Sequence, residues 1–295
     1  MTVWVLNLDA EDELRAAPGP YQPGHAMMAR MRSLARSLPG LVGPTDIVVD
    51  SDMPPDTGQD ALQGQRGAAW CPTPRALARL RAVGAIPPNA PPWQVLRQVN
   101  DRAFALTVDA GPWPSRYLHD MDALETHLQR ATPGPAGSFV LKRALGYAGR
   151  GQRRVRSRLD DSDRRWCVAS LSQGLGLVVE PWVERLADFA QHGYLGQDGQ
   201  LRLGAPTLQT CDTHGIWRGS RQAAGPDLSR PERDALLHTA ETVAEALRTA
   251  GYFGPFGTDA FRYRDPRTGR PRFHPLVELN ARYTMGFGVS GCPRR

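Results

Sequence analysis

Three side chains with hard oxygen donors lie near the carboxyl end of the chain: Asp259, Glu278 and Asn280. Glu278 and Asn280 are two residues apart, and the alternation of a β-strand places side chains at that spacing on one face. Asp259 belongs to a preceding strand-like segment, and a short DPRTGR connection favours antiparallel pairing between the two. The three donors would then converge as a set that Mg²⁺ prefers. A salt-bridge network with Arg262 or Arg282 is the alternative interpretation of the same carboxylates.

A lysine and a glycine-bearing loop form a second candidate site, in this case for phosphate. Lys142 ends the apolar segment FVLK, and the loop that follows contains Gly146, Gly149 and Gly151. Glycines let backbone amides approach an anion closely, and the lysine would supply positive charge. The loop lacks the GKS or GKT of a P-loop, so on its own it is more typical of a flexible turn than of a phosphate site.

Composition limits the class of protein. The chain has 295 residues, 41% of them hydrophobic, which is enough for a sizeable core and for two to three compact units. It contains no apolar run of about 18 residues and no signal-peptide pattern at its acidic start, so we expect a cytoplasmic protein without a membrane partner. Four cysteines without a CxxC pair argue against a zinc site or a disulfide framework. The net charge of +6 is concentrated in RGQRRVRSR, which lacks interleaved aromatic residues, so no nucleic-acid partner is expected.

Several elements must position these side chains. An N-terminal α/β unit is predicted from two short apolar strands, 3–8 and 46–50, and from a helix that Thr73 and Pro74 begin and Gly84 ends. The proline-rich segment IPPNAPP then marks a boundary, and we place three units at 1–92, 93–175 and 176–295.

The second and third units are predicted to be α+β. The middle unit contains the strand 138–143 and ends in the basic, glycine-bearing loop. In the last unit, Ser229 and Glu232 form a capping box at the start of a long helix that Gly251 ends. Two final strands, 257–263 and 272–279, carry Asp259 and Glu278.

Five segments occur in an order that resembles the ATP-grasp superfamily over nearly the whole chain: NDR (100–102), FVLK with GYAGRG (139–151), VVEPWVE with ADF (178–189), FGTDAF (256–261) and VELNAR (277–282). The resemblance implies an α/β (α+β) fold in which an N-terminal pre-ATP-grasp domain precedes two α+β lobes that sandwich ATP. It implies ATP and Mg²⁺, or Mn²⁺, as cofactors, with the metal on Asp259, Glu278 and Asn280.

The resemblance also implies roles for the phosphate-binding residues. Lys142 resembles the lysine that reaches the α- and β-phosphates, and the loop 146–151 resembles the lid over them. Arg102 is similar to a basic residue that touches phosphate. Arg282 is similar to the arginine that steadies the transferred phosphate, with a structural salt bridge to Glu278 as its alternative.

Further roles follow for the nucleoside. The segment VVEPWV resembles the adenine hinge, in which Glu180 would accept from the exocyclic amine while the backbone of Trp182 and Val183 would read the ring edge. Asp188 matches the acidic residue that binds the ribose hydroxyls, and Glu184 is its rival.

The function implied is an ADP-forming carboxylate–amine ligase acting on a small acid and an amine, an amino acid or peptide among them, in a chain that could form a homodimer. A phosphotransferase on the same fold and a non-catalytic nucleotide-binding module are the alternatives. Arg218 and Arg221 are read as a solvated basic loop or as contacts to a carboxylate substrate. We expect His192, His214 and His274 to be structural, since a lone histidine is more often so.

Overall fold

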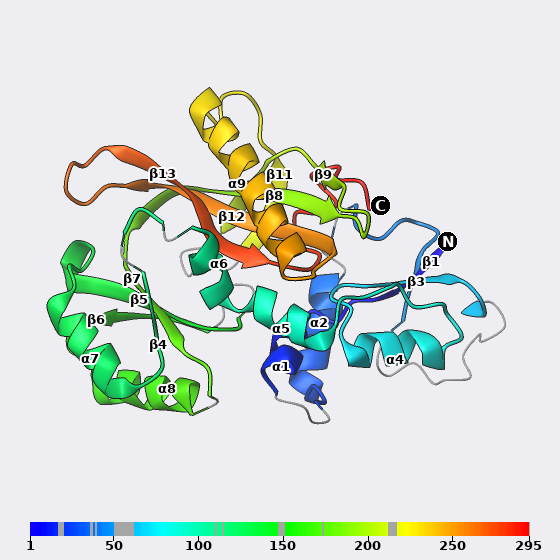
Figure 1. The fold of residues 1–295 in the computed structure, drawn as a ribbon, viewed down its shortest axis with the longest axis horizontal. Helices are drawn as coiled ribbons and strands as arrows, with labels where there is room; N and C mark the ends of the chain where they lie inside the picture. The colour runs from blue at the N-terminus through cyan, green and yellow to red at the C-terminus, as the bar shows by residue number, and fades with distance from the viewer. Residues whose placement is uncertain are drawn as a thin grey trace.

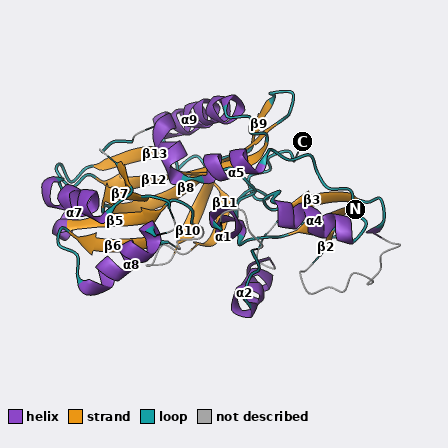
Figure 2. Cartoon of the chain, turned by 60° about the horizontal axis from the view of Figure 1, so that its bottom comes forward, coloured by secondary structure: helices purple, strands orange, loops and turns teal. Residues whose placement is uncertain are grey.

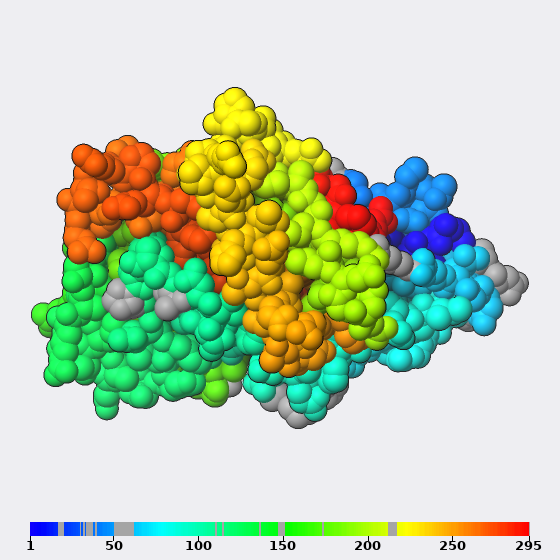
Figure 3. Space-filling view, turned by 45° about the horizontal axis from the view of Figure 1, so that its top comes forward, coloured from blue at the N-terminus to red at the C-terminus, as the bar shows by residue number. Residues whose placement is uncertain are grey.

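The computed structural model describes residues 1–16, 21–35, 38, 40–49, 62–109, 111–113, 115–146, 151–172, 174–211 and 217–294. Within these residues the strands form three sheets, one in each successive part of the chain (Figure 1). The N-terminal sheet lies at one end of the molecule, and the other two lie side by side at the opposite end (Figure 3). No helix in the described ranges is long and apolar enough to cross a bilayer.

The N-terminal sheet is parallel, with strand order β2-β1-β3. Thr73 caps the helix that packs on it by accepting a hydrogen bond from the Ala76 amide, as predicted. Helix α2 projects from this part of the molecule (Figure 2). The elements are β1 (Thr2–Val5), α1 (Ala10–Arg15), α2 (His25–Ala35), β2 (Ile47–Val48), β3 (Arg66–Ala69) and α4 (Pro74–Ala82).

The middle sheet, which we call the lid sheet, is antiparallel with strand order β4-β7-β5-β6. Two helices cover its outer face, and Leu124, Phe139 and Leu177 belong to the core between them (Figure 1). The elements are β4 (Arg116–Leu118), α7 (Met121–Arg130), the 3₁₀ helix η1 (Pro135–Gly137), β5 (Ser138–Arg143), β6 (Gln152–Arg156), α8 (Asp161–Leu171) and β7 (Leu177–Pro181).

The C-terminal sheet has strand order β11-β10-β8-β12-β13, with β9 paired to β8. Helix α9 packs on it, and the predicted capping box of Ser229 and Glu232 is present at the start of that helix. The elements are α5 (Trp93–Asn100), α6 (Arg102–Val108), β8 (Glu184–Leu195), β9 (Leu201–Leu203), β10 (Thr207–Cys211), β11 (Trp217–Gln222), α9 (Arg230–Thr249), β12 (Gly254–Arg264) and β13 (Pro271–Asn280).

The observed pairing of strands and packing of helices differ from the predicted organisation in three places. Strand β7 pairs with β4 and β5, so the lid sheet extends to Pro181 rather than ending at residue 175. Helices α5 and α6 pack on β13, so the segment after residue 92 joins the C-terminal core. The segment that contains Arg218 and Arg221 is strand β11 and not a loop, because it pairs with β10 along its length.

Candidate active site

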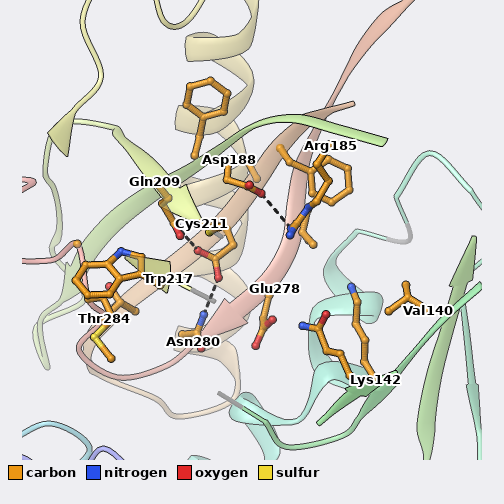
Figure 4. A pocket seen from close by; sticks show the side chains of 18 of the residues that line it. Val140, Lys142, Arg185, Asp188, Gln209, Cys211, Trp217, Glu278, Asn280 and Thr284 are labelled. Atoms are coloured by element: carbon orange, nitrogen blue, oxygen red, sulfur yellow. Dashed lines mark hydrogen bonds and ion pairs between the residues drawn. The ribbon is translucent and has the colours of Figure 1, made fainter. Parts of the chain in front are cut away.

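A cavity lies between the lid sheet and the C-terminal sheet, and it collects most of the predicted site residues. Its walls come from β5 and β7 on one side, and from β8, β10, β12 and β13 on the other (Figure 4). The predicted residues that line it are Lys142, Glu180, Trp182, Val183, Asp188, Asp259, Glu278, Asn280 and Arg282.

The three oxygen donors meet on two paired strands. Asp259 on β12 lies directly opposite Glu278 on β13, and Gly257 lies opposite Asn280. The amide nitrogen of Asn280 donates to Asp259 Oδ2 at 3.1 Å. On the other side, Gln209 Nε2 donates to Asp259 Oδ1 at 2.7 Å. The predicted antiparallel arrangement is therefore confirmed, and Gln209 of β10 joins it.

The two carboxylates are short of positive charge. Burial, together with the nearby charge of Glu278, raises the pKa of Asp259 to about 6. Glu278 has a cation partner, because Arg102 donates to its Oε1 at 2.8 Å. The salt-bridge alternative for Asp259 does not hold, since Arg262 pairs with Glu232 instead. A like-charge pair that is only half compensated is a suitable environment for a divalent cation.

The donor set fits a magnesium nucleotide better than a closed metal centre. The described part of the chain holds no cluster of three or more His, Cys, Asp or Glu side chains that could bind a metal by itself. Mg²⁺ commonly takes one or two carboxylates and completes its octahedron with water and substrate phosphates. Asp259 and Glu278 match that requirement. The amide oxygen of Asn280 accepts from Arg282, so the amide would have to turn for that oxygen to join the two carboxylates.

Lys142 enters the cavity from the lid sheet. Its Nζ lies 2.6 Å from Glu180 Oε2, and both side chains are buried. The pair forms because β5 and β7 are neighbours, with Val140 opposite Glu180 in the register. The Glu180 carboxylate, expected to meet an exocyclic amine, is therefore already engaged by Lys142.

The glycine loop is only partly described. Gly146 is buried just after β5, and Gly151 has φ +75°, a conformation that glycine adopts without a Cβ penalty. The carbonyl of Gly151 accepts a hydrogen bond from the Arg143 amide. Gly149 lies outside the described residues.

The segment that was expected to be the adenine hinge places Val183 at the cavity wall, and one of its backbone amides, that of Trp182, is already hydrogen-bonded. Val183 is buried at the cavity wall. The Trp182 amide donates to the Ser138 carbonyl at 3.0 Å, so it is not available to read a base edge, while the Trp182 ring packs under the Arg154 guanidinium at 4.6 Å. Base recognition at this hinge would fall to the remaining backbone groups.

Asp188 and Glu184 were the two candidates for binding the ribose, and of the two Asp188 alone lines the cavity. Asp188 lines the cavity, pairs with Arg185 at 3.2 Å, and has its pKa raised by burial. Glu184 pairs with Arg264 and its side chain is 58% exposed. Glu184 is therefore not brought to the cavity.

Arg282 and Arg102 are both buried, and both are held by carboxylates. Arg282 forms an ion pair with Glu11 of α1, and its Nη2 donates to Asn280 Oδ1 at 2.9 Å. The alternative pairing of Arg282 with Glu278 does not occur. Arg102, expected at phosphate, instead donates to Glu278 and to the Arg143 carbonyl, and it is not among the residues that line the cavity.

Among the residues that had no role in the sequence analysis are Trp113, Arg185 and Gln209, which line the cavity, and Glu11, which holds Arg282. Arg185 lies over the ring of Phe261 at 4.6 Å, and Trp113 stacks on the same ring with centroids 6.1 Å apart. Strand pairing brings Arg185 of β8 and Gln209 of β10 here, whereas Glu11 comes from helix α1 and Trp113 from a turn. The acidic cluster that contains Glu11 was a visible signal, but its partner Arg282 lies 271 residues away.

Two of the three histidines that were expected to be structural, His192 and His274, are described, and burial favours the neutral form of each. Burial lowers the pKa of His192 to about 3, and its ring nitrogens pair with Thr207 and Thr284. Burial, followed by the charge of Lys142, lowers the pKa of His274 to about 4. His214 lies outside the described residues.

Comparison with known proteins identifies the fold of this chain. No protein-family model and no curated protein matches the sequence. Among solved structures, N5-carboxyaminoimidazole synthetase from Staphylococcus aureus, complexed with ADP, is 12% identical with a TM-score of 0.54, over 96% of this chain and 70% of that one. A biotin carboxylase from Campylobacter jejuni is 13% identical with a TM-score of 0.58, over 98% and 67%. N5-carboxyaminoimidazole ribonucleotide synthetase from Thermus thermophilus is 18% identical with a TM-score of 0.53, over 96% and 72%. This chain has the ATP-grasp fold.

Proposed function

We propose that this chain is an ATP- and Mg²⁺-dependent ligase that activates a substrate carboxylate as an acyl phosphate for attack by an amine, releasing ADP and phosphate. The observation that carries the proposal is the buried pair Asp259 and Glu278, directly opposite each other in a cavity that Lys142 enters from the facing sheet. Complexes of similar proteins with ADP or ATP support a nucleotide in this cavity.

The cavity offers a different environment to each part of ATP. Val140, Val183 and Phe261 provide apolar surface near the hinge, which suits a purine ring. Asp188 would bind the ribose hydroxyls once Arg185 moves aside, because a carboxylate accepts hydrogen bonds from both. Lys142 would meet the phosphates, and Gly146 and Gly151 flank the loop proposed to cover them.

The metal would be held by Asp259, Glu278 and Asn280, with Mn²⁺ as an acceptable substitute because it also takes oxygen ligands. When bound, it would neutralise charge on the phosphate oxygens. Arg102 keeps Glu278 in place by direct donation at 2.8 Å. Gln209 does the same for Asp259 at 2.7 Å, so the two carboxylates are held by separate neighbours.

The reaction needs no covalent bond to the protein. An oxygen of the substrate carboxylate attacks the γ-phosphorus, the bond from that phosphorus to the β-phosphate oxygen breaks, and ADP leaves. The amine then attacks the carbonyl carbon of the acyl phosphate, and inorganic phosphate departs while the amine loses a proton. Lys142 and Arg282 would stabilise the charge that develops on the transferred group, so positioning and electrostatics account for the catalysis.

A hydroxylamine trap tests this proposal. With Mg²⁺, ATP, a carboxylic acid and hydroxylamine as the amine, the wild-type protein should form a hydroxamate and ADP in equal amounts. Glu278→Gln should abolish both products, whereas Glu184→Gln, which removes an exposed carboxylate from the same region, should leave them unchanged. A phosphorylated alcohol in place of hydroxamate would support the phosphotransferase alternative, and ATP binding without turnover would support a binding module.

A further inference from the structure

The cavity continues past the metal residues toward the N-terminal part of the chain. In the view of Figure 4, Asn280 and Glu278 lie between Lys142 on one side and Trp217 with Thr284 on the other. We call this second end the acceptor subsite. Its lining residues are Leu8, Trp70, Cys211, Trp217, Thr284 and Met285.

The polar atoms of the acceptor subsite are directed to other protein groups. The Trp217 indole nitrogen donates to Ser220 Oγ at 2.8 Å, so the ring offers its apolar face. Thr284 Oγ1 pairs with His192 Nδ1 at 2.8 Å, and the other ring nitrogen of His192 pairs with Thr207. What remains for a ligand is mainly aromatic and aliphatic surface from Leu8 and Met285 together with the two tryptophans.

Among the described residues, positive charge at this end of the cavity comes from one side chain. Of the described cations that line the cavity, Lys142 and Arg185 belong to the nucleotide side, where they pair with Glu180 and Asp188. Arg282 is the cation nearest the acceptor subsite, since it follows Asn280 and packs over the Trp70 ring at 5.4 Å. Its charge is balanced by Glu11. Among the described residues of the subsite, Arg282 is the one cation that a substrate carboxylate could approach, and it would share that charge with Glu11.

We infer that the acid which this enzyme activates is a monocarboxylic acid with an uncharged, apolar remainder, an aryl or alkyl group, that packs between Trp217, Met285 and Leu8. The inference rests on the proposed function and specifies its acceptor. A second carboxylate or a phosphate on the acceptor would be buried against the described side chains of the subsite without a cation of its own, which is unfavourable. An aromatic ring would instead gain offset contacts with the tryptophans, and a Met side chain adapts to different apolar shapes.

The test is an acid panel in the hydroxylamine assay. It compares benzoate, phenylacetate and hexanoate with succinate, glutamate and 3-phosphoglycerate at equal concentration. We expect kcat/KM for at least one of the first three acids, which carry no charge besides the carboxylate, to exceed that for each of the other three by about tenfold or more. The reason is that a binding site strongly rejects polar groups for which it has no partner.

Two substitutions at Trp217 show whether the subsite is responsible. Trp217→Ala should raise the KM for the preferred acid about tenfold with little change in kcat, because it removes binding surface shared by ground and transition states. Trp217→Phe should restore most of the lost affinity. The KM for ATP should stay unchanged in both variants, which separates loss of acceptor binding from misfolding.

The outcomes separate this inference from the proposed function. If hydroxamate forms from succinate, glutamate or 3-phosphoglycerate in preference to all three acids without a second charge, the inference is wrong but the proposed ligase function still holds. Turnover of the preferred acid unaffected by Trp217→Ala would also overturn it. ATP binding with Mg²⁺ but no hydroxamate from any acid would overturn both.

Discussion

The two sheets that line the cavity differ in whether their buried charges are paired with opposite charges. On the lid sheet each charge has one partner, as Lys142 has Glu180 at 2.6 Å. On the C-terminal sheet two carboxylates, Asp259 and Glu278, face each other, and only Glu278 has an arginine. A bound cation would therefore act on the C-terminal sheet, because the charges of the lid sheet already balance each other, whereas the carboxylate pair is balanced only when positive charge is added. Substitutions on the two faces should therefore change stability in opposite directions.

The largest effect is expected on the lid. Lys142→Met leaves the Glu180 carboxylate buried without its partner, which costs about 3 to 5 kcal/mol of unfolding free energy for pairs of this kind. Urea unfolding of the ligand-free protein measures it. The double variant Lys142→Met with Glu180→Gln should recover most of the stability but none of the ligase activity. An equally stable single variant would show that the lid pair is not balanced as described.

The opposite sign is expected at the carboxylate pair. Asp259→Asn should stabilise the protein without nucleotide by about 3 kcal/mol at pH 7, because it removes a buried charge that faces Glu278. The pKa of Asp259 is raised when folded, so the folded state binds the extra proton between about pH 4 and 6 and wild-type stability falls as the pH rises through that window. The advantage of the variant should therefore be present at pH 7 and disappear near pH 4. A destabilised variant at pH 7 would contradict this account.

A third prediction concerns the link between the N-terminal part of the chain and the site. Glu11→Gln removes the negative partner of buried Arg282 but keeps a hydrogen-bonding side chain, so we expect a loss of about 3 kcal/mol in stability, the lower end for a buried pair. Because Arg282 also donates to Asn280, kcat should fall while the KM for ATP changes little. Glu13→Gln, a neighbouring substitution on α1 whose partners Thr73 and Arg75 lie outside the cavity, is the control and should leave kcat unchanged.

The smallest effect separates the two ribose candidates. Asp188→Asn should weaken ATP binding about tenfold, which is about 1.4 kcal/mol. Glu184→Gln should leave ATP affinity unchanged, because it removes only an exposed pair with Arg264. Calorimetric titration with ATP measures both. Equal losses in the two variants would return Glu184 to the site.

Local signals in the sequence predicted much of this arrangement. The two-residue spacing of Glu278 and Asn280 on a strand, and the short connection to the strand of Asp259, were enough to predict their convergence. The capping residues Thr73 and Ser229 correctly predicted where two helices begin, because a cap forms its hydrogen bonds within the first turn of its own helix.

What the sequence did not reveal depends on contacts between distant segments. Arg102 was expected at phosphate, but its partner is decided by α6 packing on β13, which brings Glu278 within 2.8 Å. The Lys142 and Glu180 pair depends on β5 and β7 being neighbours, although β6 and α8 lie between them in the chain. Strand β11 was missed because its arginines suit a solvated loop as well as an edge strand.

The central claim is that Asp259 and Glu278 form the magnesium site of a bound nucleotide. It is tested most directly by measuring ATP affinity by calorimetry, with Mg²⁺ and with EDTA, in the wild-type protein and in Glu278→Gln. We predict that Mg²⁺ strengthens ATP binding to the wild-type protein by at least about tenfold, and that this gain is lost in the variant while binding in EDTA is retained. An equal Mg²⁺ dependence in both proteins would contradict the assignment.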